Sequence, residues 1–166
     1  MKFAHLALAC LCLLAVTACK AGPFDASSHW RPFQRPVPLL IDSESCALCF
    51  ESIDYSLDYW VEFAPYLVPT YGGPEAREMH DGTISLTCAL DEQNPRALGH
   101  TEWVHFAQTM KSAQITIWDC NDQTVTHEIG HALGLRHHGT QSSDRWLMGN
   151  GGEGWELAPA ERAWVR

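Results

Sequence analysis

Alternation between apolar and polar residues predicts strands in several short segments of the chain. In residues 83–90 the apolar side chains occupy every second position, with threonine and serine at most of the positions between. This pattern is typical of a strand with one buried face. Residues 114–118 are rich in β-branched and aromatic side chains, and residues 39–41 form a short apolar run, so we expect strands there too. Residues 97–106 are ambiguous but compatible with a strand.

Two other segments carry their apolar residues at helical spacing. Residues 50–64 do so until the proline that follows them, and proline ends such a pattern because it cannot continue a helix. Asn121 or Asp122 can cap a second helix that runs to about Leu135. Pro159 can begin a short last helix, since proline is favoured at the first helical position.

Glycine and proline mark the connections between these elements. Residues 65–74 contain three prolines and two glycines, and we expect a loop there. Residues 91–96 are predicted to form a polar turn, and residues 138–154 a glycine-rich loop. The chain shows no internal repeats, and its length of 166 residues suggests one domain.

The first residues have the features of an export signal. Lys2 supplies a positive charge, and residues 6–16 are almost wholly apolar, a run too short for a membrane span. The segment ends in the string Val-Thr-Ala-Cys, whose cysteine is Cys19. This string resembles the lipobox of bacterial lipoproteins, which implies cleavage before the cysteine and a lipid attached to it.

This leader implies a division of the chain. We expect a signal peptide over residues 1–18, a proline-rich tether over residues 19–38 and one folded domain over residues 39–166. The protein would then be held at a bacterial cell envelope, with the outer membrane as the expected location of the anchor. The alternative is ordinary signal cleavage near Ala18, which would leave a soluble secreted protein.

The charge balance narrows the range of partners. The formal net charge is −9, and an acidic chain is a poor candidate for binding nucleic acid or an anionic membrane surface. We therefore expect no nucleic-acid partner, and membrane attachment only through the lipid.

Four cysteines remain after the leader and Cys19. They are Cys46, Cys49, Cys88 and Cys120, and an even number in an exported chain suggests two disulfides. Three pairings are open. Cys46 and Cys49 also have the CxxC spacing of redox and metal sites, but with no second CxxC pair a structural disulfide is the preferred interpretation.

The segment from His127 to His137 has the sequence HEIGHALGLRH and carries the most chemistry. On a helix, His127 and His131 lie one turn apart on nearly the same side, and two imidazoles so placed can bind one metal ion. Glu128 lies beside them, where a carboxylate can contact a water at the metal. The opposite side forms a core face of apolar residues, namely Val125, Ile129, Ala132 and Leu133.

A third ligand requires the chain to leave this helix and turn back. Gly134 tolerates the positive φ found at helix C-caps, and His137 follows three residues later. Three neutral nitrogens leave one coordination position open, which is the pattern of catalytic zinc. His138 competes with His137 for the third position, although the spacing favours His137. A hydrogen-bonded histidine cluster or a non-catalytic metal site would be the alternative.

This segment resembles the metzincin signature HExxHxxGxxH and, within it, the matrixin form HExGHxLGLxH. Metzincins also have a methionine turn beneath the metal, and Met148 follows His137 by eleven residues. The resemblance is specific over about residues 82–149. It implies an α+β fold with a twisted, mostly parallel sheet, an antiparallel edge strand, a backing helix and an active-site helix. It also implies that residues 97–104 pair with an extended peptide and that residues 149–155 line a substrate pocket.

The resemblance has a consequence for the disulfides as well. In the metzincin sheet the strands that match residues 83–90 and 114–118 are parallel neighbours, which implies a bond between Cys88 and Cys120. Cys46 and Cys49 would then pair with each other or stay reduced.

The sequence also departs from the matrixin pattern. Matrixins usually have serine after the third histidine, where this chain has His138, and Tyr-Pro after the methionine, where it has Gly149 and Asn150. These differences concern the shape of the substrate pocket and leave the metal ligands unchanged.

The resemblance implies a monomeric zinc endopeptidase that acts on polypeptide. One catalytic Zn²⁺ would be held by His127, His131 and His137, with Glu128 as the general base. The alternative is a zinc-binding envelope lipoprotein without peptidase activity.

Overall fold

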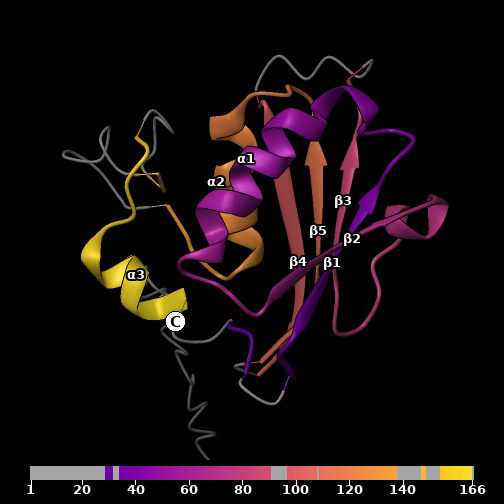
Figure 1. Cartoon of the computed structure of the whole chain (residues 1–166). Helices are drawn as coiled ribbons and strands as arrows, with labels where there is room; N and C mark the ends of the chain where they lie inside the picture. Colours follow the sequence, from indigo (N-terminus) through magenta and orange to yellow (C-terminus); the bar gives the residue numbers. More distant parts are fainter. Residues whose placement is uncertain are drawn as a thin grey trace, which may run out of the picture.

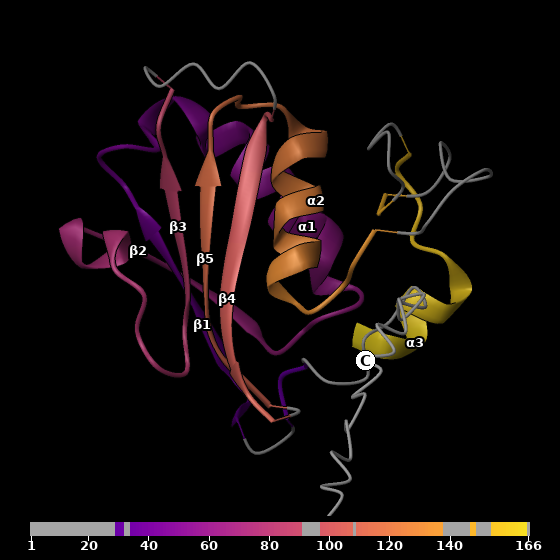
Figure 2. The ribbon, with the colours of Figure 1, turned by 180° about the vertical axis from the view of Figure 1, so that it is seen from behind.

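The structure, a computed structural model, shows a five-stranded sheet with helices packed against one face (Figures 1 and 2). It describes residues 29–31, 34–90, 97–107, 109–137, 147–148 and 154–165. The predicted signal peptide, the predicted lipid-attachment residue Cys19, and His138 lie outside the described residues.

The sheet has the strand order β2-β1-β3-β5-β4. The strands β1 (Val37–Asp42), β2 (Leu67–Gly72), β3 (Ile84–Cys88) and β5 (Thr109–Ile117) run parallel to their neighbours. Strand β4 (Gly99–Phe106) pairs antiparallel with β5 and forms one edge of the sheet. The predicted α+β class, a mostly parallel sheet with an antiparallel edge strand, is therefore confirmed.

The described residues form three α-helices beside the sheet. Helix α1 (Phe50–Val61) packs on α2 (Asp122–Ala132), which in turn packs on β4 and β5. Helix α3 (Pro159–Val165) lies beyond these helices, away from the sheet (Figures 1 and 2). In the part of the chain that the structure describes, no helix is long and apolar enough to cross a membrane.

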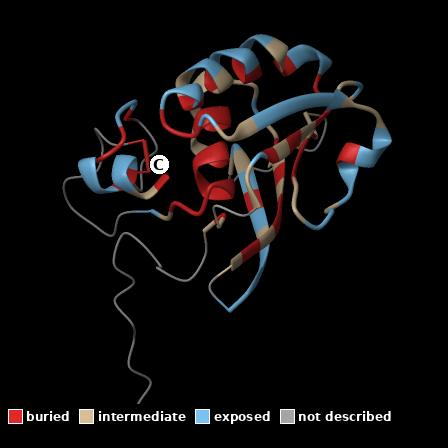
Figure 3. Ribbon diagram, turned by 60° about the horizontal axis from the view of Figure 1, so that its bottom comes forward, coloured by how far each residue is buried: buried red, intermediate tan, exposed pale blue. Residues whose placement is uncertain are grey.

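The core fills the space between the sheet and the helices (Figure 3). Alternate residues of the inner strands and the apolar face of α2 supply its fully buried side chains, as their periodicities predict. These include Leu39, Ile41, Ile84, Leu86, Ile115, Ile117, Val125 and Ile129.

Strand β2 corrects the prediction of a loop over residues 65–74. Leu67–Gly72 pairs along its whole length with β1, and only the residues from Pro74 to Arg77 form an irregular 3-10 turn. Pro69 is tolerated because β2 is an edge strand, where a missing backbone donor need not break the ladder. The strand is largely exposed, so it lacks the alternation by which strands are recognised.

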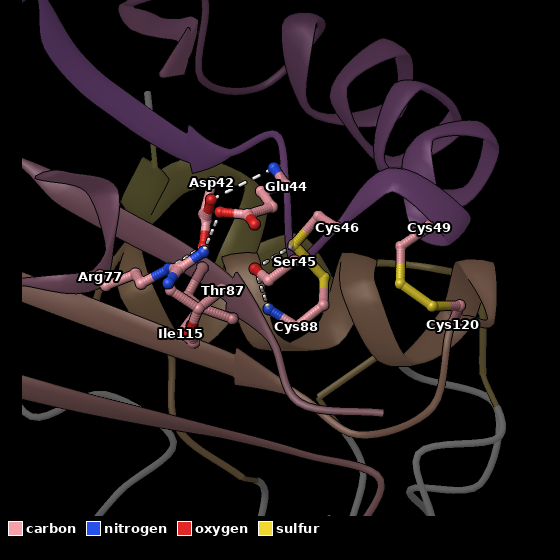
Figure 4. Close-up of a disulfide and its surroundings, with 10 residues drawn as sticks. All are labelled: Asp42, Glu44, Ser45, Cys46, Cys49, Arg77, Thr87, Cys88, Ile115 and Cys120. Atoms are coloured by element: carbon pink, nitrogen blue, oxygen red, sulfur yellow. Dashed lines mark hydrogen bonds and ion pairs between the residues drawn. A yellow bond between two sulfur atoms is a disulfide. The ribbon is translucent and has the colours of Figure 1, made fainter. Parts of the chain in front are cut away.

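Two disulfides among the described residues join Cys46 to Cys88 and Cys49 to Cys120 (Figure 4). Their Cα atoms are 4.9 and 5.0 Å apart, within the usual range for a disulfide. The predicted pairing of Cys88 with Cys120 is therefore wrong, and so is the pairing of Cys46 with Cys49.

The register of the sheet explains this error. Strands β3 and β5 are parallel neighbours, as expected, but Cys88 lies level with Ile117. Cys120 comes three residues later, where the chain has left the strand to begin α2. Cys49 occupies the N-cap position of α1, so its bond to Cys120 ties the starts of α1 and α2 together (Figure 4).

Part of the expected tether packs on the domain. Trp30 is buried in the core, and its Nε1 donates to the carbonyl of Ala132 at 2.9 Å. The carbonyl of His29 accepts from the amide of Met110. This segment therefore caps one of the carbonyls that the end of α2 leaves without a partner in the helix.

Candidate metal centre

Helix α2 begins at a side-chain cap. Asn121 has extended backbone, and its Oδ1 accepts from the amide of Thr124 at 2.8 Å, which satisfies one of the free donors of the first turn. Asp122 in that turn interacts favourably with the positive end of the helix dipole. The apolar side of α2 is fully buried, so the opposite side, which carries His127 and His131, faces away from the core.

The end of α2 is a Schellman motif. Gly134 has a φ of +97°, its amide donates to His131 O at 2.8 Å, and the amide of Leu135 donates to Gly130 O at 3.0 Å. The helix ends at Ala132, three residues before the predicted Leu135. Those residues form the turn that reverses the chain and carries His137 back toward the helix.

This turn brings three imidazole rings together. The Nε2 atom of His137 lies 2.9 Å from that of His127 and 3.1 Å from that of His131. Among the described residues, these three histidines are the group whose ligand atoms lie close enough together to hold one metal ion. His100 and His105 do not belong to it.

Backbone carbonyls orient two of the rings. His127 Nδ1 lies 2.6 Å from Leu147 O, and His131 Nδ1 lies 2.8 Å from Leu135 O. Since a carbonyl can only accept, each Nδ1 carries the proton and each Nε2 presents its lone pair to the common point. Burial lowers the pKa of His127 to about 4 and that of His131 to about 3, so both rings are neutral at physiological pH.

The donor set fits a zinc ion. Neutral imidazole nitrogens bind zinc at about 2.0–2.1 Å, which places the nitrogens of a tetrahedral site roughly 3.3 Å apart. The observed separations of 2.9 and 3.1 Å are close to this value. Two of the three converging nitrogens have no proton to share, so a cation at their common point satisfies all three lone pairs.

Met148, predicted to form a methionine turn, packs against α2 at Gly130. It is fully buried, and a Cβ atom added to Gly130 would lie 2.7 Å from its Sδ and 3.2 Å from Trp60. Gly130 thus permits close packing between α2, α1 and the turn. The neighbouring carbonyl of Leu147 is the one that orients His127.

Glu128 is held against β4. Its side chain is buried, and the hydroxyl of Thr101 donates to its Oε2 at 2.6 Å. A Cβ at Gly99 would lie 2.7 Å from Glu128 Cγ, so this position needs a residue without a side chain. Burial raises the pKa of Glu128, while the Thr101 hydrogen bond and His100 act in the opposite direction.

A cleft of about 500 Å³ opens between β4 and the histidines. Trp103 stacks on His131 with 6.4 Å between ring centroids, and the guanidinium of Arg136 lies over the Trp103 ring, 5.8 Å from its centroid. Glu128 also lines the cleft. Of the segment expected to line a substrate pocket, residues 154 and 155 are described, and Gly154 O accepts from Gln123 at 3.4 Å on the first turn of α2.

Several groups of this site were missed by the sequence analysis. Leu135 and Leu147 act through their backbone carbonyls, which every residue type has, so the sequence gives no sign of this role. Thr101 belongs to no sequence motif that would indicate its contact with Glu128. Gly99 did offer a signal, because a glycine inside a strand often marks a close approach by another part of the chain.

Comparisons with known proteins give little information about the function of this site. No protein-family model matches the chain, and no curated protein matches its sequence. One solved structure that matches is high choriolytic enzyme 1, a hatching-enzyme zinc-protease from the medaka fish Oryzias latipes, with a TM-score of 0.42 and 17% identity. The match covers 69% of this chain and 52% of that one, so the chain spans about half of that enzyme. A likeness of this extent assigns no family, and the chemistry of the cleft has to follow from its own residues.

Proposed function

We propose that the protein is a zinc-dependent endopeptidase that hydrolyses extended polypeptide. The observation that carries the proposal is the convergence of three Nε2 atoms beside a buried carboxylate, in a cleft bounded by an edge strand. A purely structural zinc site would close the fourth position with another protein ligand. The signature HEIGHALGLRH supports a relationship to the matrixins.

The residues of the cleft have different roles in the proposed hydrolysis. His127, His131 and His137 would hold the zinc, which supplies Lewis-acid chemistry and lowers the pKa of water when it is bound. Glu128 takes the proton of the attacking water and gives it to the leaving amine. Thr101 keeps the carboxylate of Glu128 in place through its hydrogen bond.

The edge strand gives the substrate a place to bind. The outer side of β4 has no neighbouring strand among the described residues, so its backbone amides and carbonyls can pair with an extended peptide. Gly99 and the side chains of Thr101 and Trp103 line the cleft. A peptide added to this edge would therefore pass directly over Glu128.

The proposal includes an envelope location. The string ending in Cys19 supports a lipid anchor. A zinc-binding envelope lipoprotein without peptidase activity is the competing function.

Metal removal and replacement test the proposal. Residues 20–166 should contain about one zinc per chain, and should digest unfolded casein in a reaction that a chelator stops and added zinc restores. His137→Ala should lose zinc and activity, whereas His105→Ala, the same change on exposed β4, should keep both. Zinc binding without any cleavage of casein or of a peptide library would favour the non-peptidase alternative.

A further inference from the structure

The N-terminal segment before β1 reaches the end of the active-site helix. Trp30 is 1% exposed, and its Nε1 donates to the carbonyl of Ala132 at 2.9 Å. Two contacts hold this segment in position. The carbonyl of His29 accepts from the amide of Met110 on β5 at 3.1 Å, and the His29 ring lies edge-on to that of Trp164 on α3, with 5.1 Å between centroids. The neighbouring residue therefore helps to fix the buried indole against α2.

The carbonyl of Ala132 needs a donor that the helix itself does not supply. A helix leaves its last carbonyls without an intrahelical partner, and the two hydrogen bonds of the Schellman motif use those of Gly130 and His131. Ala132 comes next and is fully buried. An unpaired carbonyl is destabilising in such a place, because water cannot replace the missing donor. The indole of Trp30 thus satisfies the first peptide group of the turn after α2.

The same peptide group leads into the turn that serves two of the three histidines. Leu135 O, within this turn, lies 2.8 Å from His131 Nδ1, and His137 follows two residues later. A rotation of the peptide after Ala132 toward another donor would shift both rings. Metal sites tolerate deviations of only about 0.2 Å in their ligand distances, so even a small rotation would weaken zinc binding.

We propose that Trp30 is a positioning residue of the zinc site, which holds the turn after α2 so that His131 and His137 face the metal. This inference rests on the zinc site of the proposed function, though not on peptide hydrolysis. Groups that orient metal ligands from behind typically change metal affinity by about 10–100-fold when they are removed. The segment expected to be only a tether is therefore required for tight zinc binding.

The zinc affinity of Trp30→Phe tests this role. The change removes the indole N–H but keeps an aromatic ring, and zinc binding should weaken about tenfold in a competition titration against a fluorescent zinc chelator. Trp60→Phe is the matched control, because Trp60 is equally buried and its Nε1 donates to Thr126 O at 3.0 Å on the same helix. Thr126 lies inside α2, where the amide four residues later also donates to its carbonyl. Both variants should lower the Tm of the zinc-free protein, but Trp60→Phe should keep the wild-type zinc affinity.

Amide hydrogen exchange measures the turn without zinc. In the zinc-free protein, Trp30→Phe should speed exchange at the amides of Gly134 and Leu135, whose hydrogen bonds form the turn. The amide of Val125, which donates to the cap residue at the start of α2, should exchange at the wild-type rate. Trp60→Phe should leave the two turn amides as protected as in the wild type.

A second variant keeps the test decisive if Trp30→Phe does not fold. Gln34 Nε2 donates to Met110 O at 2.7 Å, and Gln34 Oε1 accepts from Arg31 N at 2.9 Å, so Gln34→Met loosens the segment without emptying the core and should also weaken zinc binding. Wild-type zinc affinity in the variant that folds, or an equal loss of affinity in Trp60→Phe, would overturn the positioning role. A wild type that binds no zinc would count against the proposed function instead, and the exchange rates would still support or overturn the role of Trp30 in the turn.

Discussion

The backbone conformation of Gly134 forms the turn that brings His137 to the other two histidines. Its replacement by alanine tests the importance of this turn quantitatively. At a φ of +97°, an alanine costs about 1–2 kcal/mol, because its Cβ crowds the carbonyl in the left-handed region. The change also reduces the entropy of the unfolded chain, which offsets about 0.4–1 kcal/mol. The net expectation is a loss of about 1 kcal/mol in the free energy of unfolding.

The turn should persist in this variant. To escape the left-handed region, the chain would have to break the bonds from Gly134 N to His131 O and from Leu135 N to Gly130 O. At about 0.5–1.5 kcal/mol each, losing both costs at least as much as keeping the strained residue. His137 should therefore stay in place, and zinc affinity should change by no more than about threefold.

Gly82→Ala is the matched control. Gly82 has a φ of +81° in the turn before β3, and no heavy atom lies within 4 Å of the position of a new Cβ. Chemical denaturation with chelator present should show a similar loss for both variants, and thermal unfolding a decrease in Tm of roughly 3–5 °C. If Gly134→Ala were as stable as the wild type while Gly82→Ala was not, the left-handed turn after α2 would be wrong. If zinc affinity fell more than tenfold, the two hydrogen bonds would not be what holds His137.

Three further predictions concern other parts of the molecule. Thr101→Val should keep zinc but lower kcat/KM about tenfold, since it removes a hydrogen bond to Glu128 worth about 1.5 kcal/mol; Thr101→Ser should restore most of the activity, and an unchanged kcat/KM in the valine variant would contradict this role. Replacing Cys49 and Cys120 together by serine opens a loop of 71 residues and should cost about 4 kcal/mol in denaturant unfolding on the chain-entropy estimate; a loss below about 1 kcal/mol would refute that expectation. Cys19→Ser should move the protein from the membrane fraction to the soluble fraction of a bacterial expression host, and a wild type that is already soluble would support simple signal cleavage.

The parts of the fold that were predicted correctly depend on local patterns. Residues 83–90 and the helix carrying His127 and His131 have clear periodicities because one side of each packs into the core. The position of Gly134 indicated where that helix would end and turn. These signals lie within a few residues of each other in the sequence, and no distant part of the chain has to be known.

The parts that were missed depend on distant segments. Pro69 is compatible with a strand only because β2 lies at the edge of the sheet, a position that the sequence of β2 does not encode. The disulfide of Cys88 depends on the register between β3 and β5, and a shift of three residues was enough to change its partner. Thr101 meets Glu128 because β4 packs along α2. The carbonyl of Leu147 orients His127 from across a loop, and any residue type could have supplied it.

The most direct test of the endopeptidase proposal is the rate at which zinc-loaded Glu128→Gln cleaves casein, compared with the wild type and with Glu102→Gln. All three proteins should contain about one zinc per chain, because neither carboxylate is a ligand. Glu128→Gln should be slower by roughly 100-fold or more, since the amide cannot accept the proton of the attacking water. Glu102→Gln makes the same chemical change on the opposite face of β4 and should cleave at nearly the wild-type rate. A Glu128→Gln protein that keeps its zinc and still cleaves casein at a rate near that of the wild type would contradict the assignment of this cleft as a peptidase active site.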